Sequence, residues 1–382
     1  MADLLYYAPS KILLGMDTLN RLPALVKKHG SKVLLITEAI LYERNIIQKI
    51  QEYLENAGID VITFDEVVPN ATSRATEDAI RLAKGSYTQV IVGVGGIRTL
   101  SCARCTAAAM NSDKHLDDIL VENRTTNVPT PFIAVPSTNR DPFLFNNKAL
   151  ITDARDRTPH LVSVHEDTTK AVLIDPRLSL SLPTKYTATI LAETLLTAIE
   201  GYISNKATFF SDTLFLKVIP ELLSLLESGT KEPENVAMRT HAARMGILTS
   251  MGLAASAAGI GSAIAYSINS LLMIPKSWVS SVLLPHIIDY HSHSAGERLG
   301  IIAGAAGIDT ENYTTEEAIT ELIEKIREQL TMLELPLRFY DFDIQVDDLT
   351  EVPTQALQFD MMNYIPRVAN TEDVYDLLKR AQ

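Results

Sequence analysis

The first residues whose types and spacing could do chemistry are Gly95 and Gly96, which directly follow the apolar run Gln89–Val94. Glycine lets backbone N–H groups approach a phosphate closely, and the N-terminus of a following helix adds partial positive charge. Arg98 could bind a phosphate directly through its guanidinium group. A Gly-Gly pair also suits any tight turn from a strand to a helix, so this segment alone leaves both interpretations open.

A second candidate is the pair Cys102 and Cys105, spaced as C-x-x-C. This spacing occurs in redox pairs and in halves of zinc sites, but no second C-x-x-C accompanies it here. On a helix the two thiols are expected to be core residues. His286, His291 and His293 are clustered, but on a helix the last two point to different sides, so we expect packing or surface roles for them.

The composition excludes several classes of function. With 34 Lys and Arg against 47 Asp and Glu, the 382-residue chain has a formal net charge of −13. Nucleic-acid binding needs a basic face, so we expect no such partner. No apolar run reaches the ~18 residues that a membrane span requires, and the amino terminus lacks the order of a signal peptide. Together with the scarcity of cysteine, these features predict a cytoplasmic protein without a membrane partner.

The first half of the chain alternates strand-like and helix-like segments. Short apolar runs typical of buried parallel strands occur at Lys32–Thr37, Asp60–Phe64, Gln89–Val94 and Pro131–Pro136. Helical patterns separate them, as at Glu43–Ala57. This β-α-β-α order predicts a doubly wound, Rossmann-like parallel sheet with ligands at the carboxyl ends of its strands.

The character of the chain changes after residue 177. Long runs rich in Ala and Leu, with helical length and periodicity, occupy residues 188–205, 212–228, 236–258, 279–306 and 315–333. We therefore predict an α/β domain at residues 1–177 and an all-α domain at residues 178–382. The cleft between two such domains is the default place for a binding site.

Five segments, in order and at matching spacing, resemble the iron-containing (group III) alcohol dehydrogenase family. That family includes glycerol dehydrogenases and is related to 3-dehydroquinate synthases. The segments are PSKILLGMDTLNRLPALVKKHGSKVLLITE, VIVGVGGIRTLSCARCTAAAM, PFIAVPSTNRD, KAVLIDPRLSLSLP and AETLLTAIEGYIS. The resemblance implies the family's fold, a nucleotide-binding α/β domain followed by a helical domain that bears a metal. Because fold alone does not imply function, the site residues are compared one by one.

The first nucleotide loop of the family is altered here. The family's turn reads G-G-G-S with an Asp three residues later, whereas this chain has G-G-I-R and Ser101. Gly95 and Gly96 are retained, but the side chain of Ile97 is expected to crowd an approaching phosphate. Arg98 remains able to hold one.

The second nucleotide loop reads P-T-T-A-G-T-G-S-E in the family and P-S-T-N-R-D-P-F-L here. Arginine and proline replace both glycines, so the loop cannot keep the same backbone path, and a phenylalanine adds bulk. We therefore expect no cofactor, with NAD(P) binding as the less favoured alternative. The retained or altered cofactor-binding positions are Gly95, Gly96, Arg98, Ser137, Thr138 and Arg140.

The metal-binding segments of the family, D-A-L-T-H, H-A-L-A-H and P-H-G, correspond to ETLLT, SAIAY and PKS here. The resemblance thus places Glu193, Thr197, Ser262 and Lys276 at the four ligand positions and Tyr266 at the substrate-facing histidine. Imidazole and carboxylate ligands supply the affinity for a transition metal, and an ammonium group repels a cation. The expectation is no iron or zinc, with a Glu193–Lys276 ion pair in place of the metal.

These substitutions favour a family member that has lost metal-dependent alcohol oxidation and acts as a non-catalytic binding, regulatory or scaffolding protein. One alternative is a metal-independent, NAD(P)-dependent oxidoreductase acting on an alcohol or aldehyde. The other is an enzyme of another class that binds a small anionic ligand in the interdomain cleft. Tyr266 and Lys276 are the candidate catalytic residues. Family members form dimers through an amino-terminal strand, and the apolar segment Leu4–Ala8 predicts a homodimer.

Overall fold

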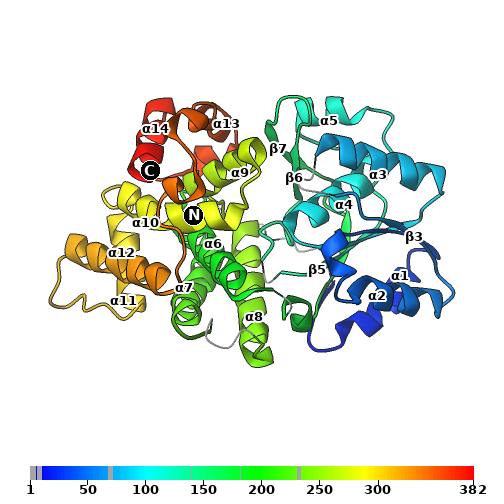
Figure 1. Cartoon of the computed structure of the whole chain (residues 1–382), viewed down its shortest axis with the longest axis horizontal. Coiled ribbons are helices and arrows are strands. Elements are labelled where there is room, and N and C mark those ends of the chain that lie inside the picture. The colour runs from blue at the N-terminus through cyan, green and yellow to red at the C-terminus, as the bar shows by residue number, and fades with distance from the viewer. Residues whose placement is uncertain (1–5, 7–10, 68–71, 139, 181, 230–233) are drawn as a thin grey trace. The chain divides into compact units, whose positions relative to one another are not determined.

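The computed structural model describes residues 6, 11–67, 72–138, 140–180, 182–229 and 234–382. Contacts divide the chain into two compact units (Figure 1). One covers residues 7–181, and the other covers residues 182–382 together with the amino terminus up to Tyr6. The segment proposed to form a dimer, Leu4–Ala8, lies outside the described residues except for Tyr6.

A six-stranded parallel sheet forms the centre of the first unit, which confirms the predicted doubly wound, Rossmann-like architecture. The strand order is β1-β8-β5-β4-β2-β3. Most residues of the four central strands are buried, because helices cover both faces of the sheet. The bounds are Lys11–Leu14 (β1), Lys32–Ile36 (β2), Asp60–Phe64 (β3), Val90–Gly95 (β4), Phe132–Pro136 (β5) and Thr169–Ile174 (β8).

Helices flank the sheet on its two faces (Figure 1). The helices α1 and α2 lie on one face, and α3 and α4 lie on the other. A further helix, α5, packs against α3. The bounds are Leu22–Val26 (α1), Ile46–Glu55 (α2), Ser73–Gly85 (α3), Ile97–Ala109 (α4) and Leu116–Glu122 (α5).

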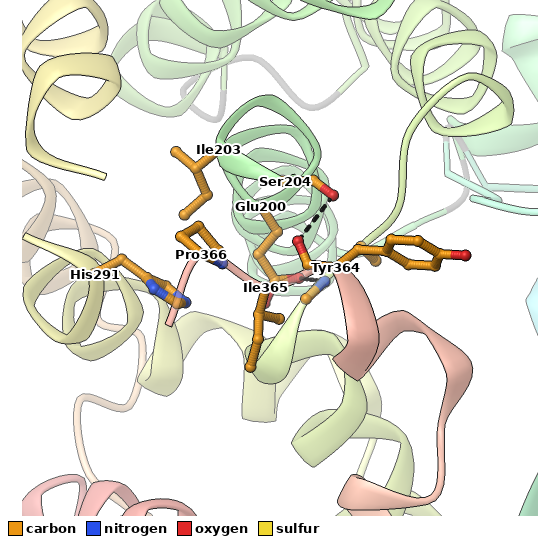
Figure 2. A pocket seen from close by; sticks show the side chains of 9 residues that line it. Glu200, Ile203, Ser204, His291, Tyr364, Ile365 and Pro366 are labelled. Atoms are coloured by element: carbon orange, nitrogen blue, oxygen red, sulfur yellow. Dashed lines mark hydrogen bonds between the residues drawn. The ribbon is translucent and has the colours of Figure 1, made fainter. Parts of the chain in front are cut away.

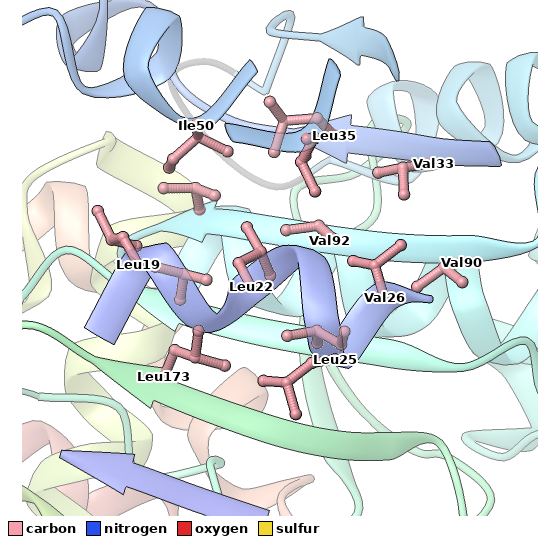
Figure 3. Packing of buried hydrophobic residues seen from close by; sticks show 14 of the residues in the cluster. Leu19, Leu22, Leu25, Val26, Val33, Leu35, Ile50, Val90, Val92 and Leu173 are labelled. Atoms are coloured by element: carbon pink, nitrogen blue, oxygen red, sulfur yellow. The ribbon is translucent and has the colours of Figure 1, made fainter. Parts of the chain in front are cut away.

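The core between α1, α2 and the sheet consists of interlocking aliphatic side chains (Figure 3). Leu22 and Leu25 of α1 and Ile50 of α2 belong to one cluster with Val92 of β4 and Leu173 of β8. All but Leu25 are completely buried. Burial of such a side chain contributes roughly 1.5–3 kcal/mol. This cluster therefore fixes the strands against the helices, and with them the strand ends at which ligands bind.

After β5 the chain forms an antiparallel hairpin of β6 (Lys148–Thr152) and β7 (Pro159–Ser163), which the sequence analysis did not predict. Asp153 organises the turn between the two strands. Its carboxylate accepts the backbone N–H of Arg155 at 2.9 Å and pairs with the Arg155 guanidinium at 2.6 Å. The sequence feature that could have predicted this hairpin is the Asp-rich segment between two apolar runs, because aspartate favours turns.

The second unit is all-α over its described residues, as predicted. The helix α6 is buried along nearly its whole length and packs against α7, α8, α9 and α10. No helix among the described residues is both long and apolar enough to span a membrane. The bounds are Thr184–Ile203 (α6), Phe209–Ser224 (α7), Val236–Ala254 (α8), Ile260–Leu272 (α9), Lys276–His291 (α10), Gly296–Ala305 (α11), Thr315–Met332 (α12), Val352–Leu357 (α13) and Thr371–Arg380 (α14).

Two of the predicted helical runs are interrupted in the structure. The run predicted at residues 236–258 stops at Ala254, and α9 begins at Ile260 after Gly259. The run predicted at residues 279–306 is divided into α10 and α11 by a turn after His291, and α10 begins earlier, directly after Pro275. The apolar periodicity continues through both breaks, so it did not reveal them.

Candidate functional site

The sheet of the first unit has a topological switch point between β2 and β4. These two strands are neighbours, but the chain continues from β2 through α2 to β3 and from β4 through α4 toward β5 on the opposite side. The helices α2 and α4 lie on opposite faces of the sheet (Figure 1). In open α/β sheets, ligands bind where the connections diverge in this way, at the carboxyl ends of the two strands. The candidate site therefore lies where β2 and β4 end.

The Gly-Gly turn lies at this point, as the last residue of β4 and the N-cap of α4. A Cβ atom on Gly95 would lie 2.5 Å from Glu38 Oε1 and 2.7 Å from Thr99 Cβ, so only glycine fits there. Gly96 precedes the 13-residue helix α4, whose N-terminal N–H groups and dipole favour an anion. The turn thus has the local geometry of a phosphate-binding site.

Glu38, which the sequence analysis did not select, is the acidic group of this site. It follows β2, and its Oε1 accepts the backbone N–H of Gly96 at 2.7 Å. Burial raises the pKa of Glu38, while the Gly96 N–H, the charge of Arg98 and the Thr99 hydroxyl act in the opposite direction. The sequence feature that could have identified Glu38 is its place directly after the apolar run 32–37. That run forms β2, which pairs with β4.

The second loop continues the site from the end of β5. In the parallel register Pro136 pairs with Gly95, and the N–H of Ser137 donates to the Gly95 carbonyl at 2.9 Å. The methyl group of Thr138 lies near Gly96, and its hydroxyl donates to the carbonyl of Arg140 at 2.9 Å. The structure therefore brings Ser137 and Thr138 beside the Gly-Gly turn.

A buried ion pair stabilises the same loop, in which the family's glycines are replaced. Asp141 Oδ2 lies 3.7 Å from Arg104 Nη2, and both side chains are at most 1% exposed. Asp141 Oδ1 also accepts the N–H of Phe143 at 2.8 Å, and Arg104 Nη1 donates to the Lys148 carbonyl at 2.8 Å. The guanidinium group of Arg104, on α4, thus connects this loop to β6. Phe143 and the following Leu144 are buried.

The two cysteines are core residues of α4, as expected. Both Cys102 and Cys105 are completely buried. Burial raises the pKa of Cys102 to about 11 and that of Cys105 to about 12. Thiols in this state are neither nucleophiles nor metal ligands at neutral pH, because the thiolate is the reactive form.

In the second unit, the positions matched to the family's metal ligands lie on three helices that pack together. Glu193 and Thr197 are one turn apart on α6, Ser262 and Tyr266 are one turn apart on α9, and Lys276 begins α10. Each of the five is at most 5% exposed. Tyr266 also packs edge-on against Phe359 at 5.8 Å between ring centroids.

The hydrogen bonds at these positions do not suit a transition metal. The Thr197 hydroxyl donates to its own helix, to the Glu193 carbonyl, at 2.6 Å. The Ser262 hydroxyl donates to a different carboxylate, and Lys276 Nζ lies 3.5 Å from Asn269 Oδ1. The described residues contain no cluster of three or more His, Cys, Asp or Glu side chains that could hold a metal. One carboxylate, two hydroxyl groups and an ammonium do not fit iron. The Glu193–Lys276 ion pair stays a prediction: both side chains are buried, on α6 and α10, which pack together.

The carboxylate that binds Ser262 belongs to Glu200, a second residue that the sequence analysis did not select. Its oxygens accept the N–H of Gly259 at 3.0 Å, the N–H of Gly261 at 2.6 Å and the hydroxyl of Ser262 at 2.6 Å. Burial raises the pKa of Glu200, and these donors oppose that effect. Ser262 is therefore part of the structure that holds the N-terminus of α9.

Glu200 also lines a narrow hollow that has no room for a water molecule (Figure 2). His291 of α10 and the segment 364–366 lie on its other sides. His291 is 1% exposed, and burial lowers its pKa to about 4, so the imidazole is neutral at physiological pH. The hollow is a gap in the packing around Glu200 rather than a collection of polar groups facing a ligand.

Comparisons with known proteins agree with the resemblance in the sequence. The model of the iron-containing alcohol dehydrogenases matches residues 9–176, and that of the C-terminal part of the Fe-containing alcohol dehydrogenase family matches residues 187–382. Lactaldehyde reductase of Escherichia coli (strain K12) is 25% identical over 374 residues, which is 96% of each chain. The crystal structure of 1,3-propanediol oxidoreductase superposes with a TM-score of 0.93 at 22% identity, over 100% of both chains. NADH-dependent butanol dehydrogenase A from Thermotoga maritima has a TM-score of 0.91 at 19% identity and covers 100% of this chain and 99% of its own.

These comparisons overturn the expectation that the protein uses no cofactor and no iron or zinc. The matching family is named for its iron, and a structural relative of nearly full coverage is named NADH-dependent. The expectation gave too much weight to missing loop glycines, since the Arg104–Asp141 pair holds that loop by other contacts. The turn at Gly95 and Gly96 fits a dinucleotide. The donors at the four ligand positions do not fit iron, and no reaction step is derived through that metal.

Proposed function

Because the chain belongs to the iron-containing alcohol dehydrogenase family, we propose that it is an oxidoreductase that binds a nicotinamide dinucleotide and acts on a small alcohol or aldehyde. The observation that carries this proposal is the Gly-Gly turn at the switch point, where the N-terminus of α4 lies between the ends of β2 and β5. When bound, a nicotinamide supplies the hydride donor or acceptor.

The groups that would hold the dinucleotide come from two loops. Gly96 and the first turn of α4 offer N–H donors to its pyrophosphate, and Gly95 leaves room for close approach. Ser137 and Thr138, beside the turn, offer hydroxyl groups. The guanidinium of Arg98, on the first turn of α4, adds positive charge near the phosphates.

The names of the relatives, which refer to lactaldehyde, 1,3-propanediol and butanol, support the proposed substrate class. In the helical unit we assign proton transfer at the substrate oxygen to Tyr266 and anion binding to Lys276. A phenol can donate and accept a proton, and an ammonium stabilises a developing alkoxide. Both side chains are almost completely buried, so their charges act in surroundings of low dielectric constant.

The test is a titration of the full-length protein with NADH and NADPH, followed by turnover with lactaldehyde, 3-hydroxypropanal and butanal at 340 nm. Each assay is run with added ferrous iron and with a chelator. We expect saturable dinucleotide binding and its loss in Gly95→Val, whose side chain would collide with Glu38 and Thr99. Gly85→Ala is the matched control, because nothing lies within 4 Å of its added Cβ atom. Absence of binding of both dinucleotides to the wild-type protein overturns the proposal.

A second candidate function is dinucleotide binding without turnover, in a regulatory or scaffolding member of the family. The observation that favours it is that the hydroxyls of Thr197 and Ser262 are already bonded within the helical unit. The same experiment separates the two functions. Binding together with oxidation of NADH by any of the aldehydes supports the enzyme, whereas binding without turnover under every metal condition supports the second candidate.

A further inference from the structure

The side chain of Asn269 spans the turn that joins α9 to α10. Its Nδ2 atom donates to the carbonyl of Ile274 at 2.7 Å, and its Oδ1 atom lies 3.5 Å from Nζ of Lys276. Asn269 is 4% exposed, so little water reaches these contacts. An amide has its donor and its acceptor on separate atoms. Because the nitrogen is bonded to Ile274, the oxygen is the atom that faces the Lys276 ammonium group.

The same residue also holds the backbone of this turn. Met273, the C-cap of α9, has a φ of 60°, in the left-handed region that a residue with a Cβ atom rarely adopts. Its N–H group donates to the carbonyl of Asn269 at 3.1 Å. Two hydrogen bonds of Asn269 therefore hold the turn, and Lys276 follows as the first residue of α10. A strained turn that is held in this way gives the lysine a defined position.

We propose that Asn269 is the positioning residue of Lys276 and that its amide directs the ammonium group toward the oxygen atom of the substrate. The inference rests on the proposed function, which assigns anion binding to Lys276 and proton transfer to Tyr266. Tyr266 and Asn269 are three residues apart on α9, so their side chains leave the same side of the helix. Both residues and Lys276 are at most 5% exposed. Asn269 therefore brings the ammonium group to the side of α9 that bears the Tyr266 phenol.

An amide suits this role better than a carboxylate or a shorter side chain. A carboxylate would place a negative charge next to the ammonium group and weaken the field that acts on the substrate oxygen. It would also face the Ile274 carbonyl without a proton to donate. Alanine would lose both contacts. The neutral amide oxygen orients the ammonium group without adding a negative charge beside it.

The alternative is that Asn269 only holds the turn. In that case loss of its amide nitrogen would loosen the start of α10, and charged and neutral ligands would lose affinity together. Positioning of the ammonium group predicts a different pattern, because a positive group interacts most strongly with a negative ligand or with an oxygen on which negative charge develops. Propionate and propan-1-ol, which are similar in size but differ in charge, therefore separate the two roles.

The experiment compares the full-length wild type with Asn269→Asp and Asn269→Ala. It measures kcat and KM with NADH and the best substrate among lactaldehyde, 3-hydroxypropanal and butanal, the Kd of NADH by calorimetry, and binding of propionate and propan-1-ol by ligand-observed NMR. Ser267→Ala is the matched control, because this buried hydroxyl of the same helix donates to the Ala263 carbonyl at 3.0 Å, away from the turn. If Asn269→Ala does not fold, it is combined with Met273→Gly, which removes the left-handed strain from the turn.

We expect kcat to fall about 10- to 100-fold in both Asn269 variants, while the KM of the aldehyde and the Kd of NADH change by less than about threefold. Propionate should bind Asn269→Asp at least about tenfold more weakly than the wild type, and propan-1-ol should bind all the proteins alike. A kcat that stays within about twofold of the wild type in both variants overturns the inference. An equal loss of affinity for propionate and propan-1-ol also overturns it, because that result assigns Asn269 to the turn alone.

The outcomes separate this inference from the proposed function. If the wild type binds NADH and reduces the aldehyde, and both Asn269 variants do so equally well, the positioning role is wrong and the proposed function stands. If the wild type neither binds NADH nor reduces an aldehyde, the proposed function fails, and propionate binding decides the inference alone. A loss of affinity in Asn269→Asp for propionate but not for propan-1-ol then supports it, whereas propionate that binds all three proteins alike, or none of them, overturns it.

Discussion

Replacing Glu200 by alanine should destabilise the helical unit, because the N-terminus of α9 loses its acceptor. The carboxylate accepts the N–H groups of Gly259, Gly261 and Ser262 and the Ser262 hydroxyl, at 2.6–3.3 Å. A buried N–H that loses its partner costs about 1–3 kcal/mol. Removal of a buried charge offsets part of the loss from three such groups. We expect the free energy of unfolding to fall by about 3–5 kcal/mol.

Glu200→Gln provides a second measurement of the same contact. Its amide oxygen still accepts an N–H group, so the loss should be smaller, about 1–2 kcal/mol at acidic pH. The raised pKa of Glu200 sets the pH dependence. Because the pKa of Glu200 is higher in the folded protein than in the unfolded chain, the protonated carboxyl group favours the folded state. This contribution is fully present below the pKa of the unfolded chain and is lost as the pH rises through the pKa of the folded protein. The stability difference between wild type and Gln variant should therefore shrink from pH 4 to pH 8.

The assay uses the protein's single tryptophan, Trp278, which lies on α10 and so reports unfolding of the helical unit. Denaturation by urea is followed by tryptophan fluorescence at several pH values. Glu321→Ala is the control, because this carboxylate is exposed on α12 and its loss should change stability by no more than about 0.5 kcal/mol. A Glu200→Ala variant within about 1 kcal/mol of wild type would refute the reasoning, as would a difference between wild type and Gln variant that grows with pH.

Three further predictions follow from other buried groups. Arg104→Met alone should lower the free energy of unfolding by about 3–5 kcal/mol, and the double variant Arg104→Met, Asp141→Asn should lower it by less. Unfolding in urea, followed by circular dichroism, measures both values. If the effects of the two single substitutions simply add in the double variant, the two residues are not a coupled pair. Cys102 and Cys105 should react with a thiol reagent at pH 8 only after unfolding, and two rapidly titrating thiols in the native protein would contradict their burial. Between pH 6.5 and pH 4, the free energy of unfolding of the wild type should fall by up to about 3 kcal/mol, and that of His291→Leu should not show this fall. The reason is that the pKa of about 4 keeps His291 neutral in the folded protein, while the same imidazole takes up a proton in the unfolded chain. If the free energy of unfolding, measured by tryptophan fluorescence, depends on pH in the same way in both proteins, His291 is not the source of the acid sensitivity.

Much of the architecture could be predicted from the sequence because its determinants are local. The apolar runs Lys32–Thr37 and Asp60–Phe64 became β2 and β3 with bounds that differ by at most one residue. The Gly95–Gly96 pair was correctly placed between a strand and a helix. Periods of 2 and 3.6 residues and the backbone freedom of glycine need no knowledge of distant segments. Comparison of motifs likewise identified the family, but it misjudged the cofactors.

What the sequence determined by itself was the order of the elements, the fold class and the residues at the family's motif positions. Only the tertiary structure decided which groups meet. Glu38 and Gly96 are 58 residues apart, and Glu200 and Ser262 are 62 apart, so no local pattern pairs them. The first contact depends on β2 lying beside β4, and the second depends on α6 packing against α9. A side chain's role as cap or ligand depends on the donors that the folded chain places around it, and those donors come from elements distant in sequence.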